Sequence, residues 1–196
     1  MSYLIRPARP SDAESCARAY APYTAMLINF EYSAPDGAEM ARRITETMRD
    51  YPWLICEKDG EVIGYAYAHR FRTRPAYDWD AELSIYLDRS ATGAGVGPAL
   101  YSALLELLRL QNYVNVYGAV SIPNPPSERL HEKLGFERVA VFRRTGRKLG
   151  EWRDLAFYHI VLNDYAASPA EVIPFPALAP EAVLRACAEG AARLNK

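Results

Sequence analysis

Hydrophobic and polar side chains follow two kinds of pattern along the chain, and each kind predicts a different element. Strict alternation predicts strands, and hydrophobic residues three or four positions apart predict amphipathic helices. Met40, Ile44 and Met48 show the helical spacing, while Asp59-Gly60 between two alternating segments is typical of a hairpin turn. Strands are predicted at residues 4–6, 53–57, 61–70, 81–87, 113–120, 138–142 and 155–162, and helices at 11–26, 39–49, 98–110 and 124–134.

Residues at the ends of these segments indicate where the helices begin and stop. Ser11 and Glu14 have the spacing of a capping box, which would begin the first helix. Asn124 suits the cap of a short helix that Gly135 would close. Between the last two strands, residues 143–154 are predicted to form a loop.

The chain after Leu162 has a different character. Prolines punctuate residues 166–180, and residues 181–194 are rich in alanine and prone to form a helix. We therefore divide the chain into a domain of residues 1–165 and a linker with a helical tail at 166–196. The apolar positions of the tail would dock on the body of the protein or on a partner subunit, or else the tail would fray.

Composition and charge narrow the classes of function. With 196 residues, half of them hydrophobic, the chain suits one α/β domain with a full core. A formal net charge of -1 offers no basic surface for nucleic acid, and no apolar run approaches the ~20 residues that span a membrane. The first residues resemble no signal peptide, and the three cysteines have no metal-ligand spacing. We expect a cytoplasmic enzyme without a metal.

A glycine-rich turn joins the strand at 81–87 to the helix at 98–110, and it is the strongest candidate for a phosphate site. Its glycines let the main chain approach an anion, and the start of the following helix attracts negative charge. The Gly-Lys-Ser/Thr of a P-loop does not follow it, and Pro98 stands where the dinucleotide fingerprint needs its third glycine. A plain connecting turn remains the alternative. The predicted cradle consists of Thr92, Gly93, Ala94, Gly95, Val96 and Gly97.

This turn resembles the pyrophosphate loop of the GNAT acetyltransferases, with Thr92, Gly95 and Gly97 at the motif positions. Thr92 stands where the family has a cation or an amide, so we expect a main-chain cradle without that side-chain contact. Residues 5–162 further resemble the phosphinothricin-type N-acetyltransferases of the same superfamily. Six segments carry that likeness in the right order: Arg6-Pro7-Ala8, Phe71 to Tyr77, Glu82 to Tyr86, Asn124 to Ser127, Leu130 to Phe136 and Gly146 to Asp154.

The resemblance implies a fold, a cosubstrate and a reaction. It implies the GNAT fold, a mixed central sheet of about six to seven strands flanked by helices, in which a splayed strand pair holds acetyl-CoA. It also implies acetyl transfer to the α-amino group of a small amino-acid-like amine, and a homodimer. Because the three cysteines have no motif partner, we expect direct attack in a ternary complex.

Glu82 is the predicted general base, by its match to the family's glutamate. Alternation along the strand places Glu82, Ser84 and Tyr86 on one face. A carboxylate inside an otherwise apolar strand is costly unless it is used or paired, and partial burial would raise its pKa toward a useful value. From the residues alone, an ion pair with Arg72 or Arg74 is the alternative.

The remaining site residues follow from the resemblance. His131 is expected near the departing sulfur, as a proton donor or as a second member of the base system, although a structural role is the alternative for a lone histidine. Arg72 and Arg74 suit an anionic acceptor because guanidinium groups bind carboxylates with two donors. Arg74 is the expected clamp for the acceptor, because its Arg-Pro setting matches the family loop. Contacts with acetyl-CoA are expected from Ser84, Ile85, Tyr86, Asn124 and Ser127, and further contacts with the acceptor from Tyr77 and Phe30.

Two other functions remain open. A catalytically idle acyl-CoA binder would fit the unusual Thr92, whereas Glu82 and His131 favour an enzyme. An acetyltransferase for a polyamine, an aminoglycoside or a protein N-terminus is the second alternative. The paired arginines favour an anionic small amine instead.

Overall fold

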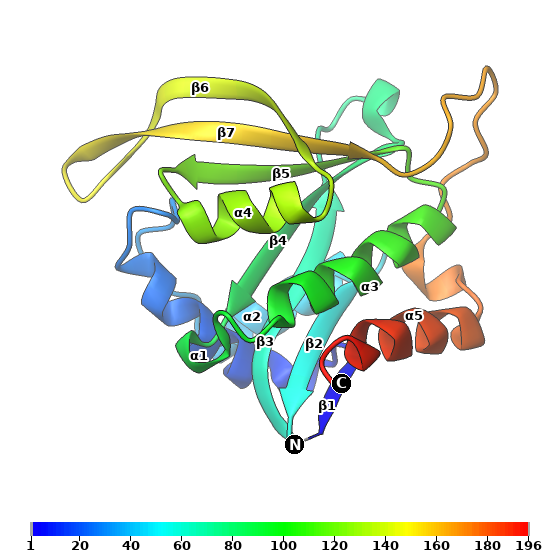
Figure 1. Cartoon of the computed structure of the whole chain (residues 1–196), viewed down its shortest axis with the longest axis horizontal. Coiled ribbons are helices and arrows are strands. Elements are labelled where there is room, and N and C mark those ends of the chain that lie inside the picture. The colour runs from blue at the N-terminus through cyan, green and yellow to red at the C-terminus, as the bar shows by residue number, and fades with distance from the viewer. Residues whose placement is uncertain (1, 196) are drawn as a thin grey trace.

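The computed structural model describes residues 2–195 and consists of one seven-stranded sheet with helices on both faces (Figure 1). The strand order is β1-β2-β3-β4-β5-β7-β6, and all neighbours are antiparallel except β4 and β5. This confirms the predicted mixed sheet. The strands are β1 (Tyr3–Pro7), β2 (Trp53–Lys58), β3 (Glu61–Arg70), β4 (Asp80–Leu87), β5 (Asn115–Ile122), β6 (Glu137–Lys148) and β7 (Glu151–Val161).

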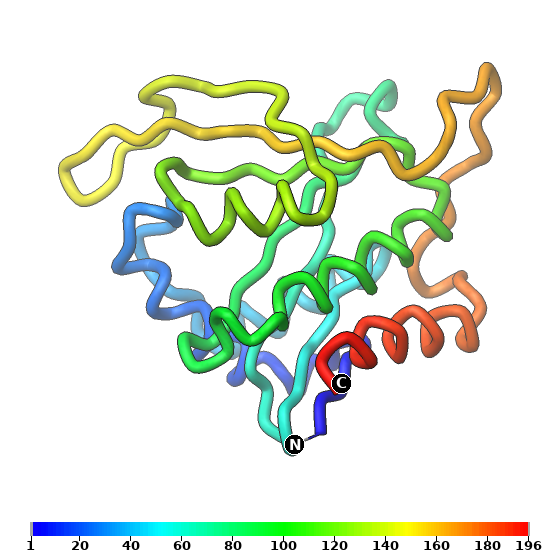
Figure 2. The backbone as a smooth tube through the Cα atoms, in the orientation of Figure 1, coloured from blue at the N-terminus to red at the C-terminus, as the bar shows by residue number. Residues whose placement is uncertain are grey.

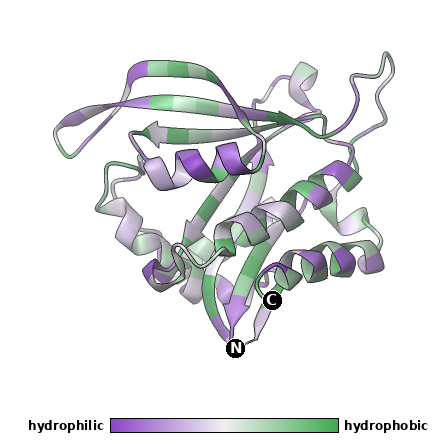
Figure 3. Cartoon of the chain, in the orientation of Figure 1, coloured by the Kyte–Doolittle hydropathy of each residue, from purple (hydrophilic) through white to green (hydrophobic). Residues whose placement is uncertain are grey.

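Two hydrophobic cores lie on opposite faces of the sheet. Helices α1 (Ala13–Thr24) and α2 (Gly37–Thr47) cover one face, and α3 (Val96–Leu110) and α5 (Pro180–Ala192) cover the other (Figure 1). The core beneath α3 is the larger, because this helix buries most of its surface. Helix α4 (Pro125–Lys133) is mostly hydrophilic, whereas hydrophobic colour is spread over the central strands (Figure 3).

Strands β4 and β5 pair along only part of their described length. The parallel ladder joins residues 80–83 to residues 115–118, and both strands then continue for four more residues. Over that stretch β4 keeps its pairing with β3, and β5 keeps its pairing with β7. The two strands therefore diverge into a V-shaped gap, as the splayed pair predicts (Figure 1).

The predicted capping box at Ser11 and Glu14 is wrong. Helix α1 begins after a 3₁₀ turn at Pro10–Asp12, and Asp12 rather than Ser11 occupies the cap position. The Asp12 carboxylate accepts the Arg9 main-chain N–H at 2.7 Å and two hydrogen bonds from Arg6, both 2.8 Å. Meanwhile the side chain of Glu14 lies against the start of α2. The ion pair between Arg6 of β1 and Asp12 thus takes the place of the predicted capping box.

The predicted loop at residues 143–154 is also wrong, because most of it belongs to a long hairpin. Strands β6 and β7 pair out to Lys148 and Glu151, and the turn is formed by Leu149 and Gly150. Both turn residues have positive φ, 49° and 85°, the conformation that a two-residue hairpin turn requires. A register shift between Phe142 and Gly146 interrupts the alternation that reveals a strand in sequence.

The C-terminal segment packs on the body of the protein. Helix α5 lies against α3 and β1, and the chain ends meet where Tyr3 N–H donates to Asn195 Oδ1 at 2.9 Å (Figure 2). Gly190 allows close packing, since a Cβ there would lie 3.0 Å from the Ala103 Cβ. Cys187 is buried in this contact, Cys16 is buried on α1 and Cys56 is buried on β2. Among residues 2–195, no helix is long and apolar enough to cross a membrane.

Candidate active site

The last residues of β4 form one side of the V-shaped gap. Along β4, Leu83 packs into the core beneath α3, while Tyr86 packs against the opposite core and contacts the Tyr20 ring at 4.5 Å. This confirms the predicted alternation, so Glu82 and Ser84 share the face of Tyr86. Since the ladder to β5 ends at Leu83, the main-chain groups of Ser84, Ile85 and Tyr86 on the β5 side border the gap.

Glu82 lies where the gap begins, in a row of three cross-strand neighbours. It pairs with His69 of β3 on one side and with Tyr117 of β5 on the other. Its side chain is 20% exposed, and Oε1 is 3.9 Å from His69 Nε2. Burial raises the pKa of Glu82, while electrostatic interactions with His69 and Arg72 oppose that rise. Glu82 is thus a partly buried carboxylate that still reaches solvent.

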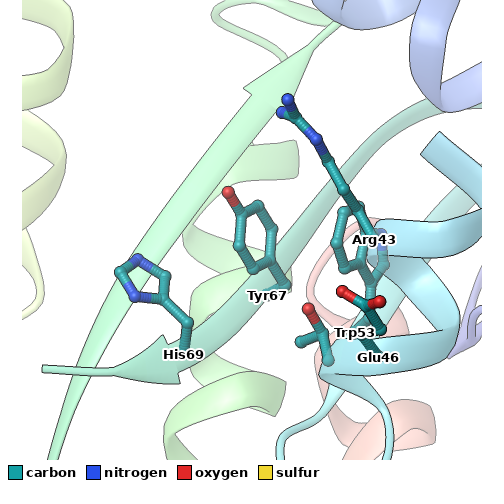
Figure 4. A pocket seen from close by; sticks show the side chains of 6 residues that line it. Arg43, Glu46, Trp53, Tyr67 and His69 are labelled. Carbon is teal, nitrogen blue, oxygen red and sulfur yellow. The ribbon is translucent and has the colours of Figure 1, made fainter. Parts of the chain in front are cut away.

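Each cross-strand neighbour of Glu82 lines a different cavity. His69 and Tyr67 line a cavity of about 290 Å³ that also contacts α2 (Figure 4). Tyr117 lines a second cavity of about 170 Å³ that is mostly aromatic. The first is bounded by Arg43, Glu46, Thr47, Trp53, Tyr67 and His69, and the second by Phe71, Arg72, Tyr117, Val139, Ala140, Phe142 and Phe157.

His131 lies on the β5 side of the gap, on α4. Its side chain is buried, with 2% exposure, and its Nδ1 is 2.8 Å from the Ser127 carbonyl. The ring reaches β5, because a Cβ on Gly118 would lie 2.2 Å from Nε2. Burial lowers the pKa of His131, against the effect of the Ser127 hydrogen bond. In the neutral tautomer that donates from Nδ1, Nε2 is an acceptor without a partner among the described residues.

The residues before His131 form the start of α4. Asn124 occupies the cap position as predicted, but its side chain does not cap the helix; its main-chain N–H donates instead to Glu128 Oε1 at 2.8 Å. The carbonyl of Ser127 is engaged by His131. Both residues lie directly after β5, so they stand at the end of that side of the gap.

The glycine-rich turn lies between β4 and α3. Gly93 and Gly95 have positive φ, 81° and 84°, which glycine adopts without strain. Helix α3 begins at Val96, so its first main-chain N–H groups have no partner within the helix and can receive an anion. The Thr92 hydroxyl donates to the Arg89 carbonyl within the turn. This fits the expectation of a main-chain cradle that lacks the Thr92 side chain.

The predicted acceptor residues separate into near and far groups. Arg72 lies over the Phe71 ring at 4.9 Å and over the Tyr77 ring at 5.9 Å, and its charge acts on Glu82. Arg74 is exposed at the start of a short turn, Pro75–Tyr77. The structure thus brings Arg72 and Tyr77 together, with Arg72 close enough to act on Glu82, and leaves Arg74 exposed at the start of the turn.

Phe30 lies across the site, against the β6–β7 hairpin. Its ring fills the space beside Gly146, where a Cβ would lie 2.4 Å from Phe30 Cζ. Two hydrogen bonds hold the same segment to the hairpin: Lys148 Nζ donates to the Asn29 carbonyl at 2.6 Å, and the Tyr32 hydroxyl donates to the Arg147 carbonyl at 2.6 Å.

Sequence reasoning missed His69 and the burial of Lys148. His69 could have been found from the hairpin around Asp59-Gly60, because alternation puts Tyr67 and His69 on one face of β3. For Lys148 the sequence offers no signal. Within residues 2–195, no three His, Cys, Asp or Glu side chains are grouped to hold a metal ion.

The fold and the gap are those of an acetyltransferase. Residues 5–157 match the family described as the acetyltransferase (GNAT) domain, and this match covers most of the chain. The protein therefore belongs to the GNAT acetyltransferase family, as the resemblance implies.

Within that family the chain is similar to enzymes that act on small amino-acid-like amines. It is 34% identical over 155 residues to the phosphinothricin N-acetyltransferase of Streptomyces viridochromogenes, covering 79% of this chain and 85% of that protein. It is 37% identical over 121 residues to the L-methionine sulfoximine/L-methionine sulfone acetyltransferase of Salmonella typhimurium, covering 61% and 70%. The crystal structure of a phosphinothricin acetyltransferase from Sinorhizobium meliloti with AcCoA superposes with a TM-score of 0.84, at 35% identity, over 89% of this chain and 97% of that one.

Proposed function

We propose that this protein transfers the acetyl group of acetyl-CoA to the α-amino group of a small, anionic amino-acid-like acceptor. Phosphinothricin, methionine sulfoximine and methionine sulfone are the acceptors suggested by its relatives. The observation that carries the proposal is the position of Glu82. A half-buried carboxylate begins the V-shaped gap and has one cavity on either side.

Acetyl-CoA would supply an acetyl thioester in the gap between β4 and β5. The first turn of α3 and the glycines before it would receive the pyrophosphate, as helix starts do for anions. Main-chain groups of Ser84, Ile85 and Tyr86 border the gap and would hold the pantetheine arm on the β4 side. On the β5 side, Asn124 and Ser127 would contact the same arm from the start of α4.

Glu82 would act as the general base. An amine is mostly protonated at neutral pH, so one proton must leave its nitrogen before that nitrogen can attack a carbonyl carbon. Burial raises the pKa of Glu82, which brings its basicity closer to that of a useful base at neutral pH. The three cysteines are buried, and burial raises the pKa of each, so a thiolate nucleophile has no support. Direct attack in a ternary complex follows.

His131 would assist from the other side of the gap. With Nδ1 donating to the Ser127 carbonyl, Nε2 can accept a proton but has none to give. Of the two roles expected from the resemblance, a second member of the base system therefore fits this tautomer better than an acid for the departing thiolate.

The acceptor would bind over the aromatic cavity with its anionic group toward Arg72. A guanidinium stacked on Phe71 and Tyr77 is held in place and keeps its donors free for a carboxylate or phosphinate. The rings of Phe71 and Tyr117 stack with their centroids 4.1 Å apart, and they would contact the acceptor side chain. Phe30, which packs against Gly146 of the β6–β7 hairpin, would lie at the edge of the acceptor site. Arg74 would attract the anionic acceptor as it approaches, rather than hold it as a clamp.

We extend the proposal to a homodimer that uses the β6–β7 hairpin. Val139, Phe142 and Trp152 expose large apolar side chains along it, at 52%, 46% and 59%. Light scattering of the purified protein tests this, and a monomer at micromolar concentration contradicts it.

Release of free CoA thiol from acetyl-CoA tests the enzymatic proposal. The panel comprises phosphinothricin, methionine sulfoximine, methionine sulfone, common amino acids, spermidine and an aminoglycoside. We expect release with the first three acceptors and with few others. Silence across the panel, with acetyl-CoA bound in calorimetry, would favour the idle acyl-CoA binder; release with spermidine or the aminoglycoside alone would overturn the choice of acceptor.

A further inference from the structure

His69 is placed to exchange a proton with Glu82. The two residues are cross-strand partners, and His69 Nε2 lies 3.9 Å from Glu82 Oε1. His69 Nδ1 is 3.2 Å from the Arg70 carbonyl, so a neutral ring that donates from Nδ1 turns the lone pair of Nε2 toward the carboxylate. One water molecule or a small rotation closes the remaining distance.

The other groups around Glu82 cannot accept its proton. Arg72 ends in a guanidinium, which has donors only and offers no acceptor for a proton. The charge of Glu82 acts on Tyr67 of β3 and Tyr101 of α3, and Tyr117 is its partner on β5. Burial raises the pKa of all three hydroxyls, so they remain neutral. An imidazole is the side chain that gains and loses a proton near neutral pH.

The cavity beside His69 offers the proton a way out. Its volume of about 290 Å³ far exceeds the ~10–15 Å³ that holds one water molecule. Figure 4 shows His69 at one side of this cavity, with Tyr67 between it and the α2 residues Arg43 and Glu46. Arg43 is already paired with Glu31 and Glu39. The His69 ring is 38% exposed, whereas Glu82 is 20% exposed and would be covered further by a bound acceptor.

We propose that His69 is the proton outlet of Glu82, a positioning residue that resets the base between turnovers. This inference rests on the proposed role of Glu82. The amine N–H bond breaks as an O–H bond forms on Glu82; that proton then moves to His69 Nε2, which gives an imidazolium and restores the carboxylate. The imidazolium releases one proton to water in the cavity, so no other reactant is needed.

The variant His69→Gln tests this, with His159→Gln as the matched control. Glutamine keeps a polar side chain of similar length but cannot carry the proton. His159 lies on β7, two strands from Glu82, where it bonds Asn115 at 2.9 Å and stacks on Tyr117. In stopped-flow release of CoA from enzyme preloaded with acetyl-CoA, we expect His69→Gln to complete its first turnover at the wild-type rate. Later turnovers should slow about tenfold, less than the ~10²–10⁴ expected for loss of the base itself.

Two further readouts separate proton transfer from a structural role. Added imidazole should restore the later turnovers of His69→Gln and leave Glu82→Gln unchanged. Because the charge of His69 lowers the pKa of Glu82, its loss should also move the acid limb of kcat/KM to higher pH.

The outcomes distinguish this inference from the proposed function. If Glu82→Gln is inactive while His69→Gln shows wild-type later turnovers and an unmoved acid limb, the outlet is wrong and the base stands. If Glu82→Gln retains wild-type turnover, the base assignment itself is wrong. A first turnover of His69→Gln slowed as much as the later ones, without rescue by imidazole, would indicate a structural role and overturn the outlet.

Discussion

The two sides of the V-shaped gap differ in how they hold their titratable group. On β4, Glu82 is partly exposed and faces His69 across a distance too long for a hydrogen bond. On the β5 side, His131 is buried among aromatic rings, with one nitrogen fixed by Ser127 and the other against Gly118. One side can exchange protons with solvent, and the other is rigid.

This difference indicates a division of roles. A base must gain and lose a proton in every cycle, which requires contact with water or with a relay such as His69. His131, the proposed second member of the base system, is instead 2% exposed and held by rigid packing, so it would support the base from a fixed position without direct exchange with solvent. Substitutions on the β4 side should therefore change rates and pH profiles, while those on the β5 side should first change stability.

The largest effect is expected for Glu82→Gln. Removal of the base should lower kcat by about 10²–10⁴. Binding of acetyl-CoA, measured by calorimetry, should stay near the wild-type value because glutamine preserves the shape. Asp80→Asn is the matched control, since Asp80 lies two residues earlier on β4, is buried and also has a pKa raised by burial. Its kcat should stay within a few-fold of wild type; an equal loss in both variants would contradict a specific role for Glu82.

On the β5 side, Gly118→Ala should be destabilising. The new Cβ would lie 2.2 Å from His131 Nε2 and 2.7 Å from Cδ2, so the buried ring must move. We expect urea denaturation to show a free energy of unfolding lower by about 3 kcal/mol, the upper end of ordinary overpacking. When Gly118→Ala is added to a His131→Ala variant, the further loss of free energy of unfolding should be much smaller. Additive losses would show that the contact with His131 is not the cause.

Arg72 tests whether the acceptor binds over the aromatic cavity. Arg72→Gln should raise KM for an anionic acceptor about tenfold, or ~1.4 kcal/mol, with kcat little changed. Arg74→Gln should have a smaller effect, because Arg74 points outward in the exposed turn. An acceptor with its carboxylate converted to an amide should be insensitive to both. A larger effect at Arg74 would reverse the assignment of the two arginines.

The smallest effect concerns stability. Burial raises the pKa of folded Glu82, so as pH rises above ~4.3 the unfolded chain ionises first and the folded state loses stability. Glu82→Gln removes this cost, and at pH 8 it should be more stable than wild type by about 1 kcal/mol or less. The gain should vanish below pH ~4, where the carboxyl is protonated in both states. A Gln variant that is less stable at pH 8 would show that the carboxylate is stabilised by its partners.

Local sequence patterns predicted the strand faces well. Leu83 and Tyr86 pack into opposite cores as the alternation requires, and the glycines at 93 and 95 adopt the positive φ that their spacing suggests. The position of Glu82 on its strand follows from alternation, whereas its role came from the resemblance and stays a prediction.

Features that depend on contacts between residues far apart in the sequence could not be predicted. The capping box failed because Arg6 of β1 binds Asp12, and nothing near Ser11 reveals that pair. The β6–β7 hairpin was missed because Phe30 occupies the space at Gly146, where the strand register shifts. Alternation along β3 indicates the face on which His69 lies, but its position opposite Glu82 depends on the register between β3 and β4.

The most direct test of the central claim is the pH dependence of acetyl transfer in a single turnover. Enzyme preloaded with acetyl-CoA is mixed with excess methionine sulfoximine, and N-acetyl product is followed from pH 5 to 9 for wild type and Glu82→Gln. The wild-type rate should fall as pH drops and Glu82 becomes protonated, and Glu82→Gln should be at least ~10²-fold slower at pH 8. Equal rates and the same acid limb in both proteins would contradict Glu82 as the base.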